Sequence, residues 1–184
     1  MADDLDVRGA WREPPVTVAE VQRATVRRTM AADEAARGRI AKALGLDALL
    51  SLEAEMRASS WLDGVQVDGR WRARVRQTCG VTLEPFDSDL EGEIRLRALP
   101  EGSAALGGPD EAGGELDLDP EGDDPPEVLT DDRIDLGAYV VEDLSLAIDP
   151  FPRKPGVEFE APEQPGEPSP FAVLAKLKGG APDA

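Results

Sequence analysis

Arginine alternates with mostly apolar residues along GRWRARVRQTC, residues 69–79. Successive side chains of a β-strand point to opposite faces of the sheet, whereas a helix would scatter every second residue around its circumference. The stretch is therefore predicted to be a half-buried strand. Its apolar face carries Trp71, Val75 and Cys79, and its other face carries four arginines: Arg70, Arg72, Arg74 and Arg76.

The stretches on either side, residues 49–61 and 88–99, alternate in the same way. Together with residues 65–79 they predict an antiparallel meander with one covered face. The dipeptide at 68–69, Asp-Gly, predicts a tight turn, and Pro85 predicts a bend. In the first stretch the alternation assigns one face to Leu50, Leu52, Ala54, Met56 and Ala58.

The segment before the meander is predicted to supply an edge strand and a helix. Residues 16–30 contain short alternating runs, which are typical of a strand. Residues 31–46 are rich in alanine and other helix formers. Thr29 is in position to cap the start of this helix, and Gly45 is in position to end it.

The strongest helical pattern lies at residues 133–148, where apolar side chains recur at helical spacing. Asp135 can cap its start and Pro150 ends it, and we expect the helix to pack over the apolar face of the meander. The preceding residues 100–130 are rich in glycine, proline and acidic residues and contain no lysine or arginine. Because they have little to bury, they are predicted to be a disordered loop.

A short C-terminal helix is predicted at residues 169–178, SPFAVLAKLK, with Ser169 as its cap and Pro170 at its first position. A helix of this length is not stable alone, so we expect it to dock on the domain or on a partner. Its candidate partner-binding residues are Phe171, Leu174, Lys176, Leu177 and Lys178.

These elements predict one α+β domain over residues 1–184. An antiparallel β-sheet meander, either open or curled toward a barrel, would be covered by one main helix. The sequence divides into 16–99, mainly strands with one helix; 100–130, the disordered acidic loop; 133–148, the main helix; and 169–178, the short C-terminal helix.

The residue types leave little room for catalysis or metal binding. The sequence has no histidine and one cysteine, so it holds no serine–histidine or cysteine–histidine pair and no thiolate metal site. It also lacks a phosphate loop of the GxxxxGK[ST] kind. We therefore expect no enzyme activity, no cofactor, no metal and no small-molecule substrate. Cys79 is either a small buried hydrophobe or a reactive thiol.

The charge and hydropathy patterns bear on location and partners. No apolar run approaches the roughly 18 residues that a membrane span requires, and MADDLDVRGAW at the start lacks the basic and apolar regions of a signal peptide. A cytoplasmic protein without membrane contact is expected. The net charge of −18 argues against indiscriminate nucleic-acid binding, although a local basic face remains compatible with it.

Three stretches resemble the YceD family, the bacterial large ribosomal RNA subunit accumulation proteins. They are TCGVTLEPF (78–86), IDLGAYVVEDLSLAIDPFP (134–152) and SPFAVLAKLK (169–178), and they occur in the family's order. The resemblance implies a cytoplasmic, non-enzymatic protein needed for normal accumulation of 23S rRNA. Many members have a C-x-x-C-L-E-P turn. Here Cys79 matches the first cysteine but Thr82 stands in the second place, so no metal role is carried over.

Two interpretations of the arginine row stay open. In the first, RNA phosphates bind the four guanidinium groups, which span about 20 Å along the strand. In the second, Glu91 and Glu93 on the neighbouring strand pair with the arginines across the sheet. The first makes 23S rRNA or a large-subunit assembly intermediate a direct partner. In the second, the acidic surface reaches that RNA through a basic ribosomal protein or processing factor.

Overall fold

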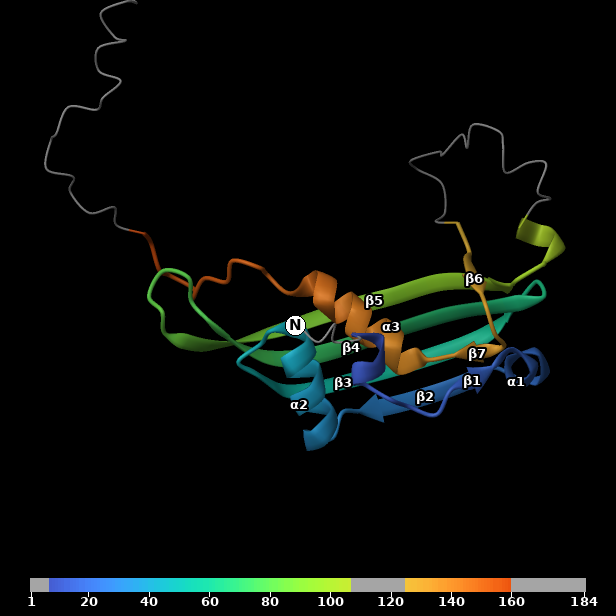
Figure 1. Ribbon diagram of the computed structural model, residues 1–184, viewed down its shortest axis with the longest axis horizontal. Helices are drawn as coiled ribbons and strands as arrows, with labels where there is room; N and C mark the ends of the chain where they lie inside the picture. The colour runs from blue at the N-terminus through green and yellow to red at the C-terminus, as the bar shows by residue number, and fades with distance from the viewer. Residues whose placement is uncertain (1–6, 107–124, 160–184) are drawn as a thin grey trace, which may run out of the picture.

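A computed structural model describes residues 7–106 and 125–159. Its main feature is a five-stranded sheet in the order β2-β3-β4-β5-β6 (Figure 1). All neighbouring strands are antiparallel except β5 and β6, which are parallel. The strands are β2 (Val26–Ala31), β3 (Ala48–Trp61), β4 (Gly64–Thr78), β5 (Pro85–Pro100) and β6 (Glu127–Leu129).

A second, two-stranded sheet pairs β1 (Val16–Thr17) with β7 (Arg133–Ile134). The described α-helices are α1 (Val18–Arg23), α2 (Glu34–Leu44) and α3 (Leu136–Ala147), and two short 3-10 helices are η1 (Arg8–Ala10) and η2 (Ala104–Leu106). No helix of the described ranges is long and apolar enough to cross a membrane.

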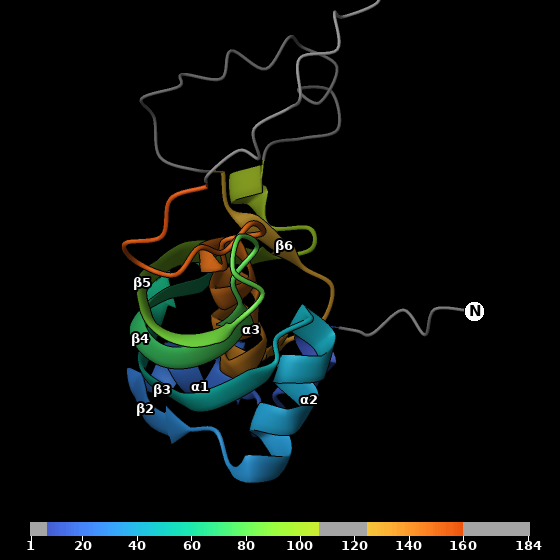
Figure 2. The ribbon, with the colours of Figure 1, turned by 90° about the vertical axis from the view of Figure 1, so that its left-hand side faces the viewer.

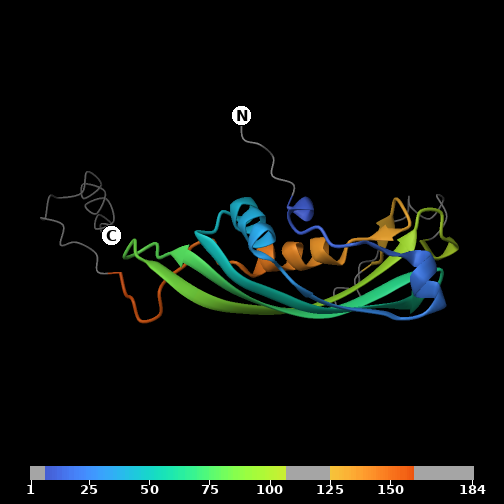
Figure 3. The same cartoon turned by 90° about the horizontal axis from the view of Figure 1, so that it is seen from below.

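The main sheet is curved and open. Seen end on, β2 to β5 wrap around α3 (Figure 2), and Figure 3 shows α2 and α3 together on the concave side. The edge strands β2 and β6 do not pair with each other, so the sheet does not close into a barrel. The α+β prediction is confirmed. Of the two sheet forms that the sequence allowed, open or curled toward a barrel, the structure has the open one.

The alternation of β4 accounts for the core. Every second side chain from Val65 to Val75 faces the concave side, and Val67, Trp71 and Ala73 among them are buried. Burying a side chain of valine size contributes about 1.5–3 kcal/mol. The middle strand, β4, buries several such side chains while it is paired with β3 on one side and β5 on the other. The hydrophobic pattern therefore fixes the register, since a one-residue slip would expose this whole set.

The main helix is confirmed in position and role. The Asp135 side chain caps α3 by accepting hydrogen bonds from the backbone N–H groups of Gly137 and Ala138 at 3.0 and 3.1 Å. The buried face of α3 packs on the sheet through Leu136, Val140, Val141 and Leu144. The helix is shorter than the predicted 133–148, because Arg133–Ile134 forms β7.

Three predictions for the N-terminal half need correction. The expected edge strand is present, but it begins only at Val26, as β2, because α1 occupies Val18–Arg23; Thr17 and Glu20 cap that helix reciprocally. The next helix begins at Glu34 with Asp33 as its cap, not at 31 with Thr29. The tight turn lies at Leu62–Asp63, between the paired Trp61 and Gly64, and not at 68–69. Asp68 and Gly69 instead continue β4, paired on both sides.

One face assignment in β3 is also wrong by one residue. The pairing passes from Leu49 opposite Val75 to Ser51 opposite Arg74. Leu50 is the extra residue of a β-bulge, which changes the face on which the preceding residues lie. Leu49 therefore joins Leu52 in the core, and Leu50 is only partly buried.

The predicted disordered loop, residues 100–130, is partly structured. At its end, β6 pairs with residues 98–100 of β5 and buries Leu129. At its start, the Ser103 hydroxyl donates a 2.8 Å hydrogen bond to Asp63, and η2 follows. The middle of this segment, 107–124, lies outside the described residues.

Candidate functional site

The four predicted arginines of β4 lie on the convex face of the main sheet, opposite the face that carries α3. Their side chains are 45–82 % exposed. They lie on one face because they occupy alternate positions of a single regular strand. The sequence therefore located this row of cations correctly.

Acidic strands flank this row on both sides. On β5, the residue directly opposite each arginine is a carboxylate: Arg70 faces Glu93, Arg72 faces Glu91, Arg74 faces Asp89 and Arg76 faces Asp87. On β3, Glu55 lies opposite Arg70 and Glu53 opposite Arg72. Because directly opposed side chains are close enough to interact, the register alone surrounds the arginines with negative charge.

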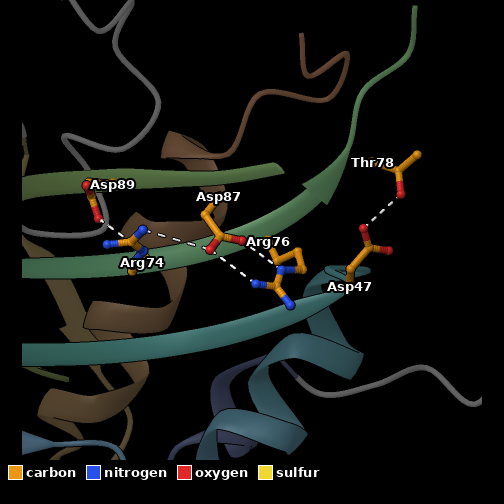
Figure 4. Close-up of polar contacts among 6 residues, drawn as sticks. All are labelled: Asp47, Arg74, Arg76, Thr78, Asp87 and Asp89. Atoms are coloured by element: carbon orange, nitrogen blue, oxygen red, sulfur yellow. Dashed lines mark hydrogen bonds and ion pairs between the residues drawn. The ribbon is translucent and has the colours of Figure 1, made fainter. Parts of the chain in front are cut away.

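Two of the arginines form close ion pairs. Arg70 donates two hydrogen bonds to one carboxylate oxygen of Glu55, at 2.6 and 3.1 Å. Arg76 donates to both oxygens of Asp87, at 2.7 and 3.1 Å (Figure 4). This bidentate contact lowers the pKa of Asp87 and raises the pKa of Arg76.

The other two pairs are looser. Arg72 lies 3.6 Å from Glu91. Arg74 lies between two carboxylates, 3.8 Å from Asp87 and 4.0 Å from Asp89 (Figure 4). Such exposed pairs are each worth only about 0–1 kcal/mol, so they neutralise charge more than they stabilise the fold.

The charge order inverts further along the same face. Asp68 on β4 lies between Arg57 on β3 and Arg95 on β5, and the Arg95 guanidinium lies 3.7 Å from its carboxylate. The convex face is therefore a mosaic of opposed charges. This arrangement agrees with the ion-paired interpretation, in which Glu91 and Glu93 pair with the arginines. The close partner of Arg70, however, is Glu55 on β3, a strand that the interpretation did not include.

The β3 carboxylates were missed by the sequence reasoning. Glu53 and Glu55 alternate with apolar residues in the predicted strand 49–61, so their face could be predicted. Which arginine each one meets depends on the register of two strands, and the turn at Leu62–Asp63 sets that register. Asp87 was missed because the third strand begins at Pro85, before the predicted start at residue 88.

Cys79 lies in the loop between β4 and β5, and its side chain is fully buried. Its sulfur accepts hydrogen bonds from the backbone N–H groups of Lys154 and Thr82, at 3.4 and 3.5 Å. These bonds lower the pKa of the thiol to about 6 although burial acts in the opposite direction. The burial of Cys79 agrees with the first interpretation, a buried side chain. Its lowered pKa shows that it is not simply a small hydrophobe, because a thiol with this pKa ionises near neutral pH. Within residues 7–106 and 125–159 no cluster of three or more potential ligands could hold a metal.

The candidate partner-binding residues of the C-terminal segment, Phe171, Leu174, Lys176, Leu177 and Lys178, lie outside the described residues. Their role stays a prediction.

Comparison with known proteins adds one match. The model of the family described as large ribosomal RNA subunit accumulation protein YceD matches residues 67–178. This range covers more than half of the chain and includes most of β4 and all of β5 and α3. Neither a search of curated proteins nor a search of solved structures finds a match.

Proposed function

Because this chain belongs to the YceD family, which is named for accumulation of the large ribosomal RNA subunit, we propose that it is a non-enzymatic ribosome biogenesis factor. It supports the synthesis, processing or stability of 23S rRNA in the cytoplasm. YceD is not a known enzyme family, and the sequence offers no histidine and a single cysteine for catalysis. The protein would therefore act by binding.

We infer further that it binds a basic protein of large-subunit assembly, and that its arginines do not contact RNA directly. One observation carries this inference: every arginine of the β4 row lies directly opposite a carboxylate of β5. A phosphate that approached Arg72 would also approach Glu53 and Glu91, and like charges at such distances repel. The same carboxylates are well placed to attract lysine and arginine side chains.

Direct RNA contact through Arg70, Arg72, Arg74 and Arg76 is the second candidate. The exposure of these side chains favours it, because exposed ion pairs cost little to exchange. In that mechanism phosphates displace the carboxylates when 23S rRNA or an assembly intermediate binds. The displaced carboxylates would still lie on β3 and β5, close to the bound phosphates, and their negative charge would weaken the contact between RNA and the arginines.

A pull-down of the tagged full-length chain from cell lysate, with and without ribonuclease, separates the two candidates. Protein contact predicts that a large-subunit protein or processing factor stays bound after the RNA is digested. Loss of all large-subunit components on digestion would favour the arginine–RNA mechanism. The broader function is tested by deleting the gene: an unchanged ratio of 23S to 16S rRNA would contradict it.

A further inference from the structure

The outer edge of β5 is open over most of its length. On one side, β4 pairs with β5 from Pro85 to Ala98. On the other side, β6 pairs only with residues 98–100, and no other described strand follows (Figure 1). Residues 85–97 therefore present one row of backbone N–H and C=O groups that no described strand satisfies.

An open edge of this kind can accept a further strand from another chain. Main-chain hydrogen bonds then supply affinity, and alternate side chains supply specificity. The convex-facing residues along the open part of β5 include four consecutive carboxylates, which follow Pro85 and precede two arginines: Asp87, Asp89, Glu91 and Glu93. A guest strand beside them would place its own alternate side chains next to this acidic row.

Three of these carboxylates are available to a guest. Asp89 and Glu91 are 81 % and 78 % exposed, and their contacts with arginine are 4.0 and 3.6 Å long. Glu93 is exposed and forms no ion pair with any described residue. Only Asp87 is firmly held, by Arg76.

We propose that the open edge of β5 binds an extended, lysine- or arginine-rich segment of a partner protein as an added strand. Basic side chains at alternate guest positions would lie beside Asp89, Glu91 and Glu93. The side chains between them would face the concave side, toward Leu90 and Ile94. This inference rests on the proposed function, and it gives the basic partner a binding site and a mode of binding.

A second copy of this chain fits the edge less well. An antiparallel pair of β5 strands centred on Ile94 would match charges, since Glu93 would face Arg95 of the other copy. That register, however, places residues 88–90 of the second copy beside residues 98–100 of the first, where β6 already lies. A separate segment that ends before Ala98 avoids this collision.

The test mixes the purified full-length protein with a labelled ten-residue peptide in which lysine alternates with valine and threonine. Fluorescence anisotropy measures the binding of the peptide. Strand addition predicts binding that is lost when the peptide is N-methylated at the alternate amides that face β5, because methylation removes the main-chain donors. The peptide methylated at the other set of alternate amides, which face away from β5, should still bind. Binding that survives methylation of each of the two sets in turn would overturn strand addition, and so would a complete lack of binding. The acidic edge would then only protect the sheet from aggregation.

Two single variants locate the site. Glu93→Lys and Glu53→Lys make the same charge change at exposed carboxylates on the convex face, each beside an arginine of β4 and neither ion-paired with a described residue. Only Glu93 lies on the open edge. Glu93→Lys should weaken peptide binding about tenfold, while Glu53→Lys should change it by less than about threefold. Equal effects would show attraction by overall charge and overturn the assignment.

A charge swap completes the test. The triple variant Asp89→Lys, Glu91→Lys, Glu93→Lys should lose the lysine peptide and bind the same peptide with glutamate in place of lysine. If this variant does not fold, the single variants and the methylated peptides still decide. If the peptide tests fail while the pull-down still retains a protein partner after ribonuclease treatment, the proposed site at the β5 edge is rejected and the proposed function stands. Peptide binding together with an unchanged 23S level in the deletion strain would reject the proposed function alone.

Discussion

The indole Nε1 of Trp71 donates a 2.6 Å hydrogen bond to Oδ2 of Asp143, which joins the middle strand to α3 across 72 positions of sequence. Trp71 is 1 % exposed and lies opposite Gly92 of β5. A Cβ atom at position 92 would lie 2.6 Å from the Asp143 carboxylate and 2.7 Å from the indole ring. The absence of a side chain at Gly92 therefore lets strand and helix meet.

Removing the acceptor should destabilise the protein. In Asp143→Ala the buried indole N–H loses its partner, which costs about 1–3 kcal/mol. Asp143→Asn keeps a side-chain oxygen and should lose less than half as much. Urea unfolding of both variants measures the difference, and equal stabilities for alanine and wild type would show that the bond contributes nothing.

Gly92→Ala should also destabilise, by about 1–3 kcal/mol, because the new methyl group forces Trp71 and Asp143 apart. Gly38 in α2 provides the control, since nothing lies within 4 Å of a Cβ built there. Gly38→Ala should stabilise by about 0.5–1 kcal/mol, as alanine favours helix. Thermal and urea unfolding of the two variants should therefore shift in opposite directions; a shift of the same sign would contradict the close approach at Gly92.

Two leucines of α3 offer a matched pair. Leu144 is fully buried, whereas Leu146 is 84 % exposed. Leu144→Ala should cost about 2–5 kcal/mol, and Leu146→Ala should stay within about 0.5 kcal/mol. A small effect at Leu144 would mean that α3 does not cover the sheet. The measurement is the free energy of unfolding at equilibrium.

The pKa of Cys79, lowered to about 6, predicts a pH dependence. Between pH 6 and about 8.5, the native thiolate holds no proton while the unfolded thiol still does. Stability should therefore rise with pH across this window and fall as pH drops through 6. The sequence has no histidine to titrate there. Cys79→Ser should flatten the rise; an equal slope in both proteins would show that the thiol is not the cause.

The sequence predicted the long strands well because their alternation is local. GRWRARVRQTC buries one face over its whole length, and no tertiary contact competes with that pattern. It failed at one place where a local signal was overlooked and at another where the deciding contact is distant. Thr17 and Glu20 form a capping box that starts the helix Val18–Arg23, in a segment whose short runs favour a strand. Glu127–Leu129 becomes a strand only because residues 98–100 of β5 lie beside it.

The candidate site divides in the same way. The face and exposure of the β4 arginines follow from period-two alternation, and both were predicted. The identity of their partners depends on strand register: Glu55 meets Arg70 only because the turn lies at Leu62–Asp63. The turn predicted at 68–69 could not have placed that pair. Sequence patterns therefore located the cations, and the fold determined how far they are neutralised.

The most direct test of this neutralisation is RNA binding by a quadruple variant: Arg70→Gln, Arg72→Gln, Arg74→Gln and Arg76→Gln. Its folding should change little, because each lost exposed ion pair costs at most about 1 kcal/mol. We predict that the folded variant and the wild type bind 23S rRNA fragments with equal affinity and equal salt dependence. Weaker binding, with a salt slope shallower by about 0.7–0.9 per lost phosphate contact, would contradict the account and assign the row to RNA.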